Sequence, residues 1–254
     1  MPLAFFMKIT MTTFRIVLLC LLPVLSVAQR AVSTRLKAGA DLGVGFQASR
    51  ISPSFIYYQL INPTRTGLFS LGYTVAFRTF YANDVDYITA PVSPLVPAKL
   101  DTLRMNYASG TSLNLGIRAQ INLKFIEIGA SADLLGLTIG KGRVGQYISS
   151  GGSFVAGQTA KGTDSLSRFV GANINQTARP SLVNFQLPGN STLGTVANEV
   201  YARVYVQQRI GIKLAYQWLA SEYTTTVRNT VDDNNRFRSR SGLVYVGITF
   251  PFYD

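Results

Sequence analysis

The stretch from Val200 to Trp218, VYARVYVQQRIGIKLAYQW, decides how the rest of the chain is interpreted. Apolar side chains alternate with polar or small ones up to Val206 and again from Ile210 onward. A period of two predicts two β-strands, and the short Gln-Gln-Arg connection between them predicts an antiparallel hairpin. Each strand therefore presents one face to an apolar medium and the other to a polar one.

Two architectures satisfy this pattern. In a soluble β-sandwich the apolar face points into the core, whereas in a membrane-spanning β-barrel it points outward to lipid and the polar face lines the lumen. The rest of the chain decides between them.

The same alternation recurs along the chain, and the connections sort by length. Eight strands are expected, at 35–47, 54–61, 68–81, 103–123, 126–134, 200–206, 210–218 and 242–252. Connections after the second, fourth and sixth strands are short, whereas long loops are expected at 83–102, 139–196 and 220–241. An even strand number with short turns at one end and long loops at the other is typical of outer-membrane barrels. We therefore predict an all-β fold, a transmembrane up-and-down antiparallel β-barrel of 8 strands, or of 10 if the segments 153–158 and 182–187 are also strands.

Charged residues in the middle of the strands support the lumen assignment. A basic side chain facing lipid near the bilayer midplane costs about 2–4 kcal/mol. Eight charged residues share the polar parity and are predicted to form a charge network in the lumen: Lys37, Asp41, Arg78, Arg118, Glu127, Asp133, Arg203 and Lys213. The opposite parity carries the aromatic residues predicted to face lipid: Phe46, Phe69, Tyr73, Phe77, Tyr81, Tyr216, Trp218, Phe250 and Phe252.

These inward charges have two interpretations. An eight-stranded barrel is just wide enough for side chains to fill its interior, which favours a structural network of ion pairs. If the lumen conducts, the excess of Arg and Lys predicts a weak preference for anions.

The N-terminal residues have the pattern of an export signal. Lys8 and Arg15 precede a short apolar run, and Ser26-Val27-Ala28 has the small-x-small form of a cleavage site. We predict a signal peptide over 1–28, cleaved near Ala28, and a single barrel domain over 29–254. Cys20 is the only cysteine, so the mature chain has no disulfide and no cysteine metal site.

Composition excludes several classes of function. The formal net charge of +12 is spread singly over strands and loops without neighbouring aromatic clusters, so no nucleic-acid partner is expected. A basic surface beside anionic lipopolysaccharide accounts for the charge. The chain has no histidine, the usual general base of outer-membrane hydrolases. Glu127 and Asp133 lie about 20 Å apart on one strand, too far for joint acid–base catalysis. We expect no enzymatic activity, no cofactor and no metal.

The chain resembles the small outer-membrane β-barrel proteins of Gram-negative bacteria, and most closely those of the Bacteroidota. The resemblance rests on the signal ending Val27-Ala28-Gln29, on the eight amphipathic strands and on the aromatic C-terminal strand that ends TFPFYD at 249–254. It implies a location in the bacterial outer membrane and recognition of the last strand by the barrel-assembly machinery, although Pro251 and Asp254 depart from the usual ending. Asp101-Thr102-Leu103 and Asp164-Ser165-Leu166 look like the O-glycosylation sequence of the Bacteroidota, with Thr102 and Ser165 as acceptors.

Three functions remain open on the sequence. The first is a non-enzymatic structural or interaction barrel, whose surface loops contact other outer-membrane proteins or make it a subunit of a larger outer-membrane assembly. The second is a small, weakly anion-preferring, porin-like channel. The third is a soluble exported barrel that holds an apolar ligand, as lipocalins do.

Overall fold

The computed structural model describes residues 36–63, 67–90, 101–123, 125–148, 174–186, 192–206, 210–228 and 235–253. Within these residues the regular structure is entirely β. The predicted signal peptide, Ser165 and the candidate strand at 153–158 lie outside them. No helix among the described residues is long and apolar enough to cross a membrane. The strands are β1 (Leu36–Gln47), β2 (Arg50–Ile61), β3 (Phe69–Thr89), β4 (Thr102–Leu123), β5 (Ile126–Ile139), β6 (Arg143–Ile148), β7 (Asn175–Pro180), β8 (Val183–Phe185), β9 (Val196–Val206), β10 (Ile210–Thr225) and β11 (Arg236–Tyr253).

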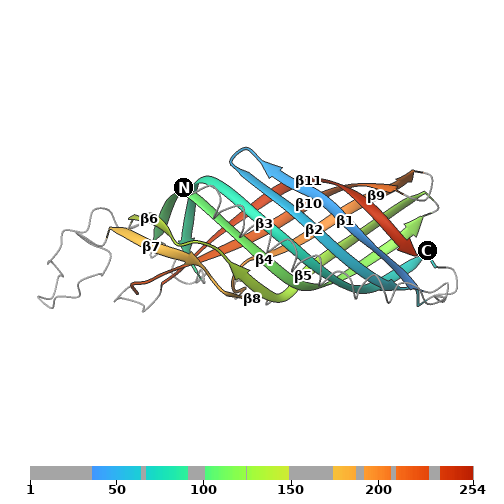
Figure 1. The fold of residues 1–254 in the computed structure, drawn as a ribbon, viewed down its shortest axis with the longest axis horizontal. Helices are drawn as coiled ribbons and strands as arrows, with labels where there is room; N and C mark the ends of the chain where they lie inside the picture. Colours follow the sequence, from blue (N-terminus) through green and yellow to red (C-terminus); the bar gives the residue numbers. More distant parts are fainter. Residues whose placement is uncertain are drawn as a thin grey trace, which may run out of the picture.

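Eight of these strands close into a ring (Figure 1). Each of β1 to β4 pairs with the next strand along the chain, β5 pairs with β9, and β9, β10 and β11 follow in order. The pairing of β11 with β1 closes the ring, and every pairing is antiparallel. The expected all-β antiparallel barrel is therefore confirmed as a ring through eight strands, within a sheet that has eleven strands among the described residues.

A second, narrower ring continues beyond the first. At the end that carries the long connections, β4 pairs with β6, β6 with β7, and β7 with β10. The pairing of β11 with β3, through Phe237 and Thr89, closes a ring of six strands: β3, β4, β6, β7, β10 and β11. In Figure 1, β6 and β7 project to the left of the eight-stranded part. We call this six-stranded part the extension.

The extension corrects the expected loop boundaries. Strand β3 runs to Thr89 and β4 begins at Thr102, so most of the described part of 83–102 is strand. The expected loop 220–241 is reduced in the same way, because β10 runs to Thr225 and β11 begins at Arg236. The expected loop 139–196 contains β6, β7 and β8, and β8 overlaps the candidate strand at 182–187.

The loop boundaries differ because the apolar and polar faces of the strands are exchanged in the extension. In the extension the inward side chains are apolar and the outward ones are polar. Because the apolar side chains of every strand are expected to point outward, the sequence pattern assigns these polar-faced strands to loops. On β3 the change occurs at Asp84, whose φ of 49° is a left-handed conformation. Ala82 is buried before it and Val85 after it, so the buried parity shifts by one residue there.

The core of the molecule lies in the extension. Fourteen buried apolar and aromatic residues form one cluster, and they come from all six strands of the extension and from the adjoining ends of the larger ring. The largest of them include Phe80, Tyr87, Met105, Tyr223 and Phe237. The extension therefore has the packed apolar interior of an ordinary water-soluble β-structure.

Inside the larger ring, glycines on β1 make room for tyrosines. A Cβ atom at Gly39 would clash with the Tyr58 hydroxyl oxygen, and one at Gly43 would lie 2.6 Å from that of Tyr245. Both rings project into the lumen and leave no space for larger side chains opposite them. The lumen at this level is filled by side chains, as the width of an eight-stranded barrel predicts.

Candidate functional site

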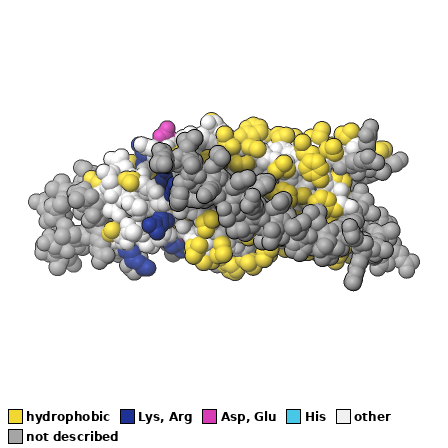
Figure 2. All heavy atoms as spheres, in the orientation of Figure 1, with side chains coloured by type: hydrophobic (Ala, Val, Ile, Leu, Met, Phe, Trp, Pro, Cys, Tyr) yellow, Lys and Arg dark blue, Asp and Glu magenta, His cyan; other side chains and the backbone are white. Residues whose placement is uncertain are grey.

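The outer face of the eight-stranded ring is a continuous apolar belt. All nine aromatic residues predicted to face lipid lie on it, and their exposed fractions run from 37% for Phe69 to 49% for Trp218. Leu113, Ile212 and Leu214 on the same face are more than half exposed. Figure 2 shows hydrophobic side chains gathered over the half of the molecule that holds the ring, with Lys and Arg side chains beyond its edge.

The inner face of the same ring is charged. The structure brings all eight predicted lumen residues inside the barrel, where six of them form connected ion pairs and Arg78 and Asp133 form a further pair. Seven of them are buried, and the exception is Lys37 at the end of the ring that carries the short turns, whose side chain is 21% exposed. Apolar side chains outside and charges inside reverse the arrangement of a water-soluble protein.

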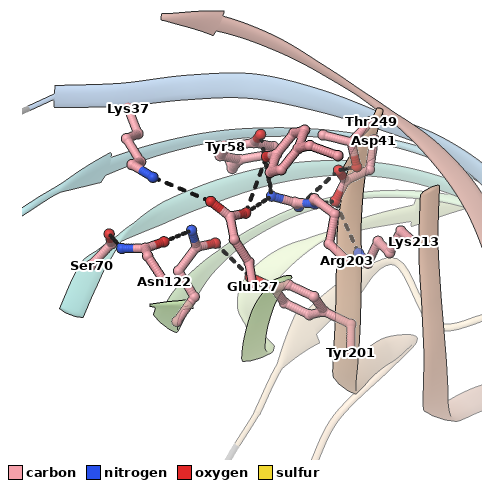
Figure 3. A network of polar contacts seen from close by, with 12 residues as sticks. Lys37, Asp41, Tyr58, Ser70, Asn122, Glu127, Tyr201, Arg203, Lys213 and Thr249 are labelled. Carbon is pink, nitrogen blue, oxygen red and sulfur yellow. Dashed lines mark hydrogen bonds and ion pairs between the residues drawn. The ribbon is translucent and has the colours of Figure 1, made fainter. Parts of the chain in front are cut away.

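Asp41 is the centre of this network. Its carboxylate accepts bonds from Arg118 at 2.9 Å, from Arg203 at 3.0 Å and from Lys213 at 2.9 Å. The hydroxyl of Thr249 donates a fourth bond at 2.6 Å. These residues come from five strands, so one carboxylate ties together β1, β4, β9, β10 and β11. Figure 3 shows Asp41 with Arg203, Lys213 and Thr249 around it.

A second central carboxylate, Glu199, was not predicted from the sequence. It accepts bonds from Lys213 at 2.6 Å, from Arg118 at 3.2 Å and from Ser131 at 2.9 Å, and it is fully buried. Glu199 has the same parity as Arg203, but the expected strand began only at Val200. Extending the alternation by one residue would have placed it in the lumen.

Two further groups of ion pairs lie toward the two ends of the ring, one joined to Asp41 through Arg203 and one separate from it. At the turn end, Glu127 accepts bonds from Arg203 at 2.7 Å and from Lys37 at 3.2 Å. Toward the extension, Arg78 pairs with Asp133, which also accepts a bond from Asn114 at 2.9 Å. The described network therefore holds five cations against four carboxylates.

Tyrosine rings surround the buried guanidinium groups. The Arg118 Cζ lies 4.7 Å from the centroid of the Tyr58 ring and 5.0 Å from that of Tyr201, and Arg203 contacts the same two rings. Among the described residues, Nε and Nη1 of Arg118 have no hydrogen-bond partner. The aromatic faces supply electrostatic compensation for these nitrogens through cation–π contacts.

Residues predicted for other chemistry are dispersed. Glu127 and Asp133 belong to different ion pairs, one with Arg203 and one with Arg78, and do not converge. No group of three or more His, Cys, Asp or Glu residues in the described part of the chain is placed to hold a metal ion. Thr102, the described candidate for glycosylation, begins β4 with a half-buried side chain and pairs with Ile88 and Ile148 on either side.

A separate ion cluster lies on the extension. Glu222 accepts bonds from Arg236 at 2.8 Å and from Arg238 at 2.9 Å, and both guanidinium groups also bond to the backbone carbonyl of Thr192. Glu222 and Arg238 are cross-strand partners on β10 and β11, on the face opposite the Tyr223 and Phe237 rings of the core. The cluster was not predicted, because the sequence pattern assigned these residues to a polar loop.

Comparisons with known proteins give only distant similarities. No family model matches the chain, and no curated protein matches it. Among solved structures, Neisserial surface protein A is 11% identical, with 85% of this chain and 94% of that chain covered and a TM-score of 0.34. A mutant porin of Rh. blastica is 9% identical, with coverages of 85% and 99% and a TM-score of 0.10. Similarity this low supports no statement about function, so a functional assignment has to rest on the geometry of the barrel itself.

Proposed function

We propose that this chain is a non-enzymatic, integral outer-membrane β-barrel protein with a sealed lumen and a structural or interaction role at the cell surface. The observation that carries the proposal is the reversal of faces in the eight-stranded ring, with apolar side chains outside and paired charges inside. An exposed apolar belt around a whole barrel is stable in lipid and a liability in water.

The height of the belt fits a bilayer. Exposed apolar residues on β10 run from Ile210 to Trp218, and those on β3 run from Phe69 to Tyr81. At roughly 3.3 Å per residue and a tilt of about 40°, these runs rise about 20 Å and about 30 Å. Outer-membrane barrels have an apolar band about 25 Å tall, which lies between the two values.

The orientation follows from the connections. Long connections of outer-membrane barrels face the cell exterior and short turns face the periplasm. The extension therefore projects from the cell surface, and β1 begins and β11 ends on the periplasmic side. Phe250 and Phe252 lie on the outer face of β11 and supply the aromatic final strand that the barrel-assembly machinery reads in the Bacteroidota type of barrel.

Two barriers in series favour a sealed lumen over a channel. The ion-pair network fills the eight-stranded ring, and the apolar cluster of the extension closes the same axis above it. Fully buried side chains such as Arg203 and Tyr223 occupy these two layers. With the interior filled, the outer surface of the extension is the part of the molecule that can meet partners.

Heat-modifiable gel mobility of the mature protein from outer membranes tests the proposal. We expect the protein in the membrane fraction and a change of mobility on boiling, because folded membrane barrels resist detergent until heated. The same protein in planar bilayers should show no stepwise conductance. Solubility without detergent and no mobility change would exclude a membrane barrel, and stable conductance steps would replace the sealed barrel with a channel.

The variant Arg118→Ala separates a structural network from a pore lining. We expect a lower unfolding midpoint, because Asp41 and Glu199 each lose a buried partner. Conductance should stay absent, because the apolar cluster of the extension is untouched. Conductance that appears in this variant would show that the network itself is the barrier.

A further inference from the structure

We propose that Gln59, on the lipid-facing side of β2, donates a hydrogen bond to the ester carbonyl oxygen of a phospholipid in the periplasmic leaflet. The contact lies toward the end of the eight-stranded ring that carries the short turns. This inference rests on the proposed membrane insertion of that ring, and it assigns a specific lipid contact to one side of the barrel. We call the group formed by Gln59, Tyr57 and Tyr73 the amide site.

Gln59 is a polar residue on an otherwise apolar outer face. It shares the outward parity of β2 with Tyr57 and Ile61. Tyr58 and Leu60, on the other parity, point into the lumen and are buried. Gln59 itself is partly exposed, and Ile61 beyond it is 55% exposed. Because a carboxamide without hydrogen-bond partners is unfavourable in an apolar medium, Gln59 needs partners on this face.

Two tyrosine hydroxyls satisfy the amide oxygen. Tyr73 on β3 is the cross-strand partner of Gln59, and its hydroxyl donates to Oε1 at 2.6 Å. The hydroxyl of Tyr57 donates to the same oxygen at 3.4 Å. With Oε1 held in this way, the amide nitrogen is the group that still needs a partner.

The amide nitrogen of Gln59 meets no acceptor within the described part of the chain, where the bonds of this side chain are the two to Oε1. Elsewhere on the outer face, Thr79 and Thr111 bond to each other at 3.1 Å and need no outside partner. A carboxamide nitrogen carries two N–H donors and accepts no bond. An ester carbonyl oxygen accepts and carries no donor, so the two groups are complementary.

The position along β2 places this donor near the edge of the hydrocarbon. The outer face of β2 runs from Ile51 to Ile61, which are 52% and 55% exposed. At roughly 3.3 Å per residue and a tilt of about 40°, this run rises about 25 Å, the height of the apolar band of outer-membrane barrels. Gln59 lies two residues from the turn end of the run, about 5 Å inside the band. A long polar side chain can reach the interface from there, where the acyl ester groups lie.

Packed aromatic rings hold the amide site in place. The Tyr57 ring stacks on Phe252 of β11 with centroids 6.4 Å apart, and it lies 6.3 Å from the ring of Tyr73. Ala40 of β1 pairs with Tyr57 and is only 3% exposed, although it lies on the outer parity. The rings therefore pack over a small residue on the strand between β2 and β11. Because the tyrosines are fixed before lipid binds, little conformational freedom is lost in forming the contact.

Ester and ether phosphatidylcholines with the same chains provide the test, because the ether lipid has no carbonyl oxygen. The full mature protein is folded into vesicles of each lipid and unfolded with denaturant. Gln59→Leu should raise the unfolding equilibrium constant by a larger factor in the ester lipid than in the ether lipid. The two factors should differ about fivefold, the value of one net hydrogen bond. Equal factors in the two lipids would overturn the proposal and leave interfacial water as the acceptor.

Gln120→Leu is the matched control. Gln120 lies in the lumen, is buried, and bonds through both amide atoms, to Asn122 and to Tyr201. Its substitution should raise the unfolding equilibrium constant by the same factor in both lipids. A lipid-dependent factor for Gln120→Leu as large as that for Gln59→Leu would also overturn the proposal, because the difference would then belong to the bilayer as a whole.

Solid-state NMR tests the contact without unfolding. With ¹⁵N in the glutamine side chains and ¹³C in the ester carbonyl groups, we expect a dipolar contact in the unchanged protein and in Gln120→Leu, but not in Gln59→Leu. Absence of the contact from the unchanged protein inserted in the vesicles would overturn the lipid assignment alone. If the protein does not float with vesicles of either lipid, the ring is not inserted, and the proposed function itself fails. Gel mobility before and after boiling shows that each variant has folded.

Discussion

Replacing Asp41 with asparagine should lower the free energy of unfolding by about 3–5 kcal/mol, the cost of removing one partner from a buried ion pair. Asp41 is fully buried and bonds to Arg118, Arg203 and Lys213. Asparagine keeps the size of the side chain and removes its charge. Five cations of the network then face three carboxylates. The measurement is reversible denaturant unfolding in phospholipid vesicles, followed by the fluorescence of Trp218.

The matched control is Asp86→Asn. Asp86 also pairs with an arginine, Arg104, but their side chains are 48% and 53% exposed. Exposed ion pairs contribute about 0–1 kcal/mol, so this variant should lose at most that much. Equal losses in the two variants would contradict the view that burial makes the network stabilising.

A second substitution should recover part of the stability lost by Asp41→Asn. Adding Lys213→Met removes one of the cations that Asp41 neutralised and returns the network to an excess of one positive charge. Buried ion pairs replaced by apolar residues of similar size often leave stability unchanged. We expect the double variant to be more stable than Asp41→Asn alone. Additive losses would indicate that the two residues act independently.

The eight-stranded ring could be predicted because one physical rule governs its whole surface. An apolar outer face and a filled polar lumen force a strict alternation, and Lys213 and Leu214 are assigned to opposite faces by parity alone. The same rule placed charges from six strands in one interior without any knowledge of their distances. Which cation meets which carboxylate depends on strand stagger, and this is why the central position of Asp41 could not be derived from the sequence.

The extension could not be predicted because its strands alternate in the same way but turn their apolar side chains inward and their polar side chains outward. Val85 and Tyr87 point inward while Asp86 and Arg104 point to water, as in any soluble sheet. The shift at Asp84 conceals the continuity of β3, because a single residue in a left-handed conformation reverses the parity of the residues after it. The pairing of β6 with β7 joins segments far apart in the sequence, and period alone cannot reveal such a contact.

Placing a charge on the apolar belt gives the second large effect. Leu214 lies midway along the exposed apolar run of β10 and is 57% exposed. Arginine there should lower the free energy of unfolding by about 2–4 kcal/mol if the position lies near the bilayer midplane. At a water-exposed position the same substitution changes stability by about 0.5 kcal/mol or less. Unfolding in phospholipid vesicles, compared with the unchanged protein, distinguishes the two values.

Gln146→Arg is the control, because it adds the same charge to an exposed position on β6 in the extension. We expect it to leave stability within about 0.5 kcal/mol of the unchanged protein. A large loss for Leu214→Arg with none for Gln146→Arg is the result that a belt in lipid and an extension in water require. If the two variants behave alike, the reversal of faces has another cause, and the membrane assignment must be abandoned.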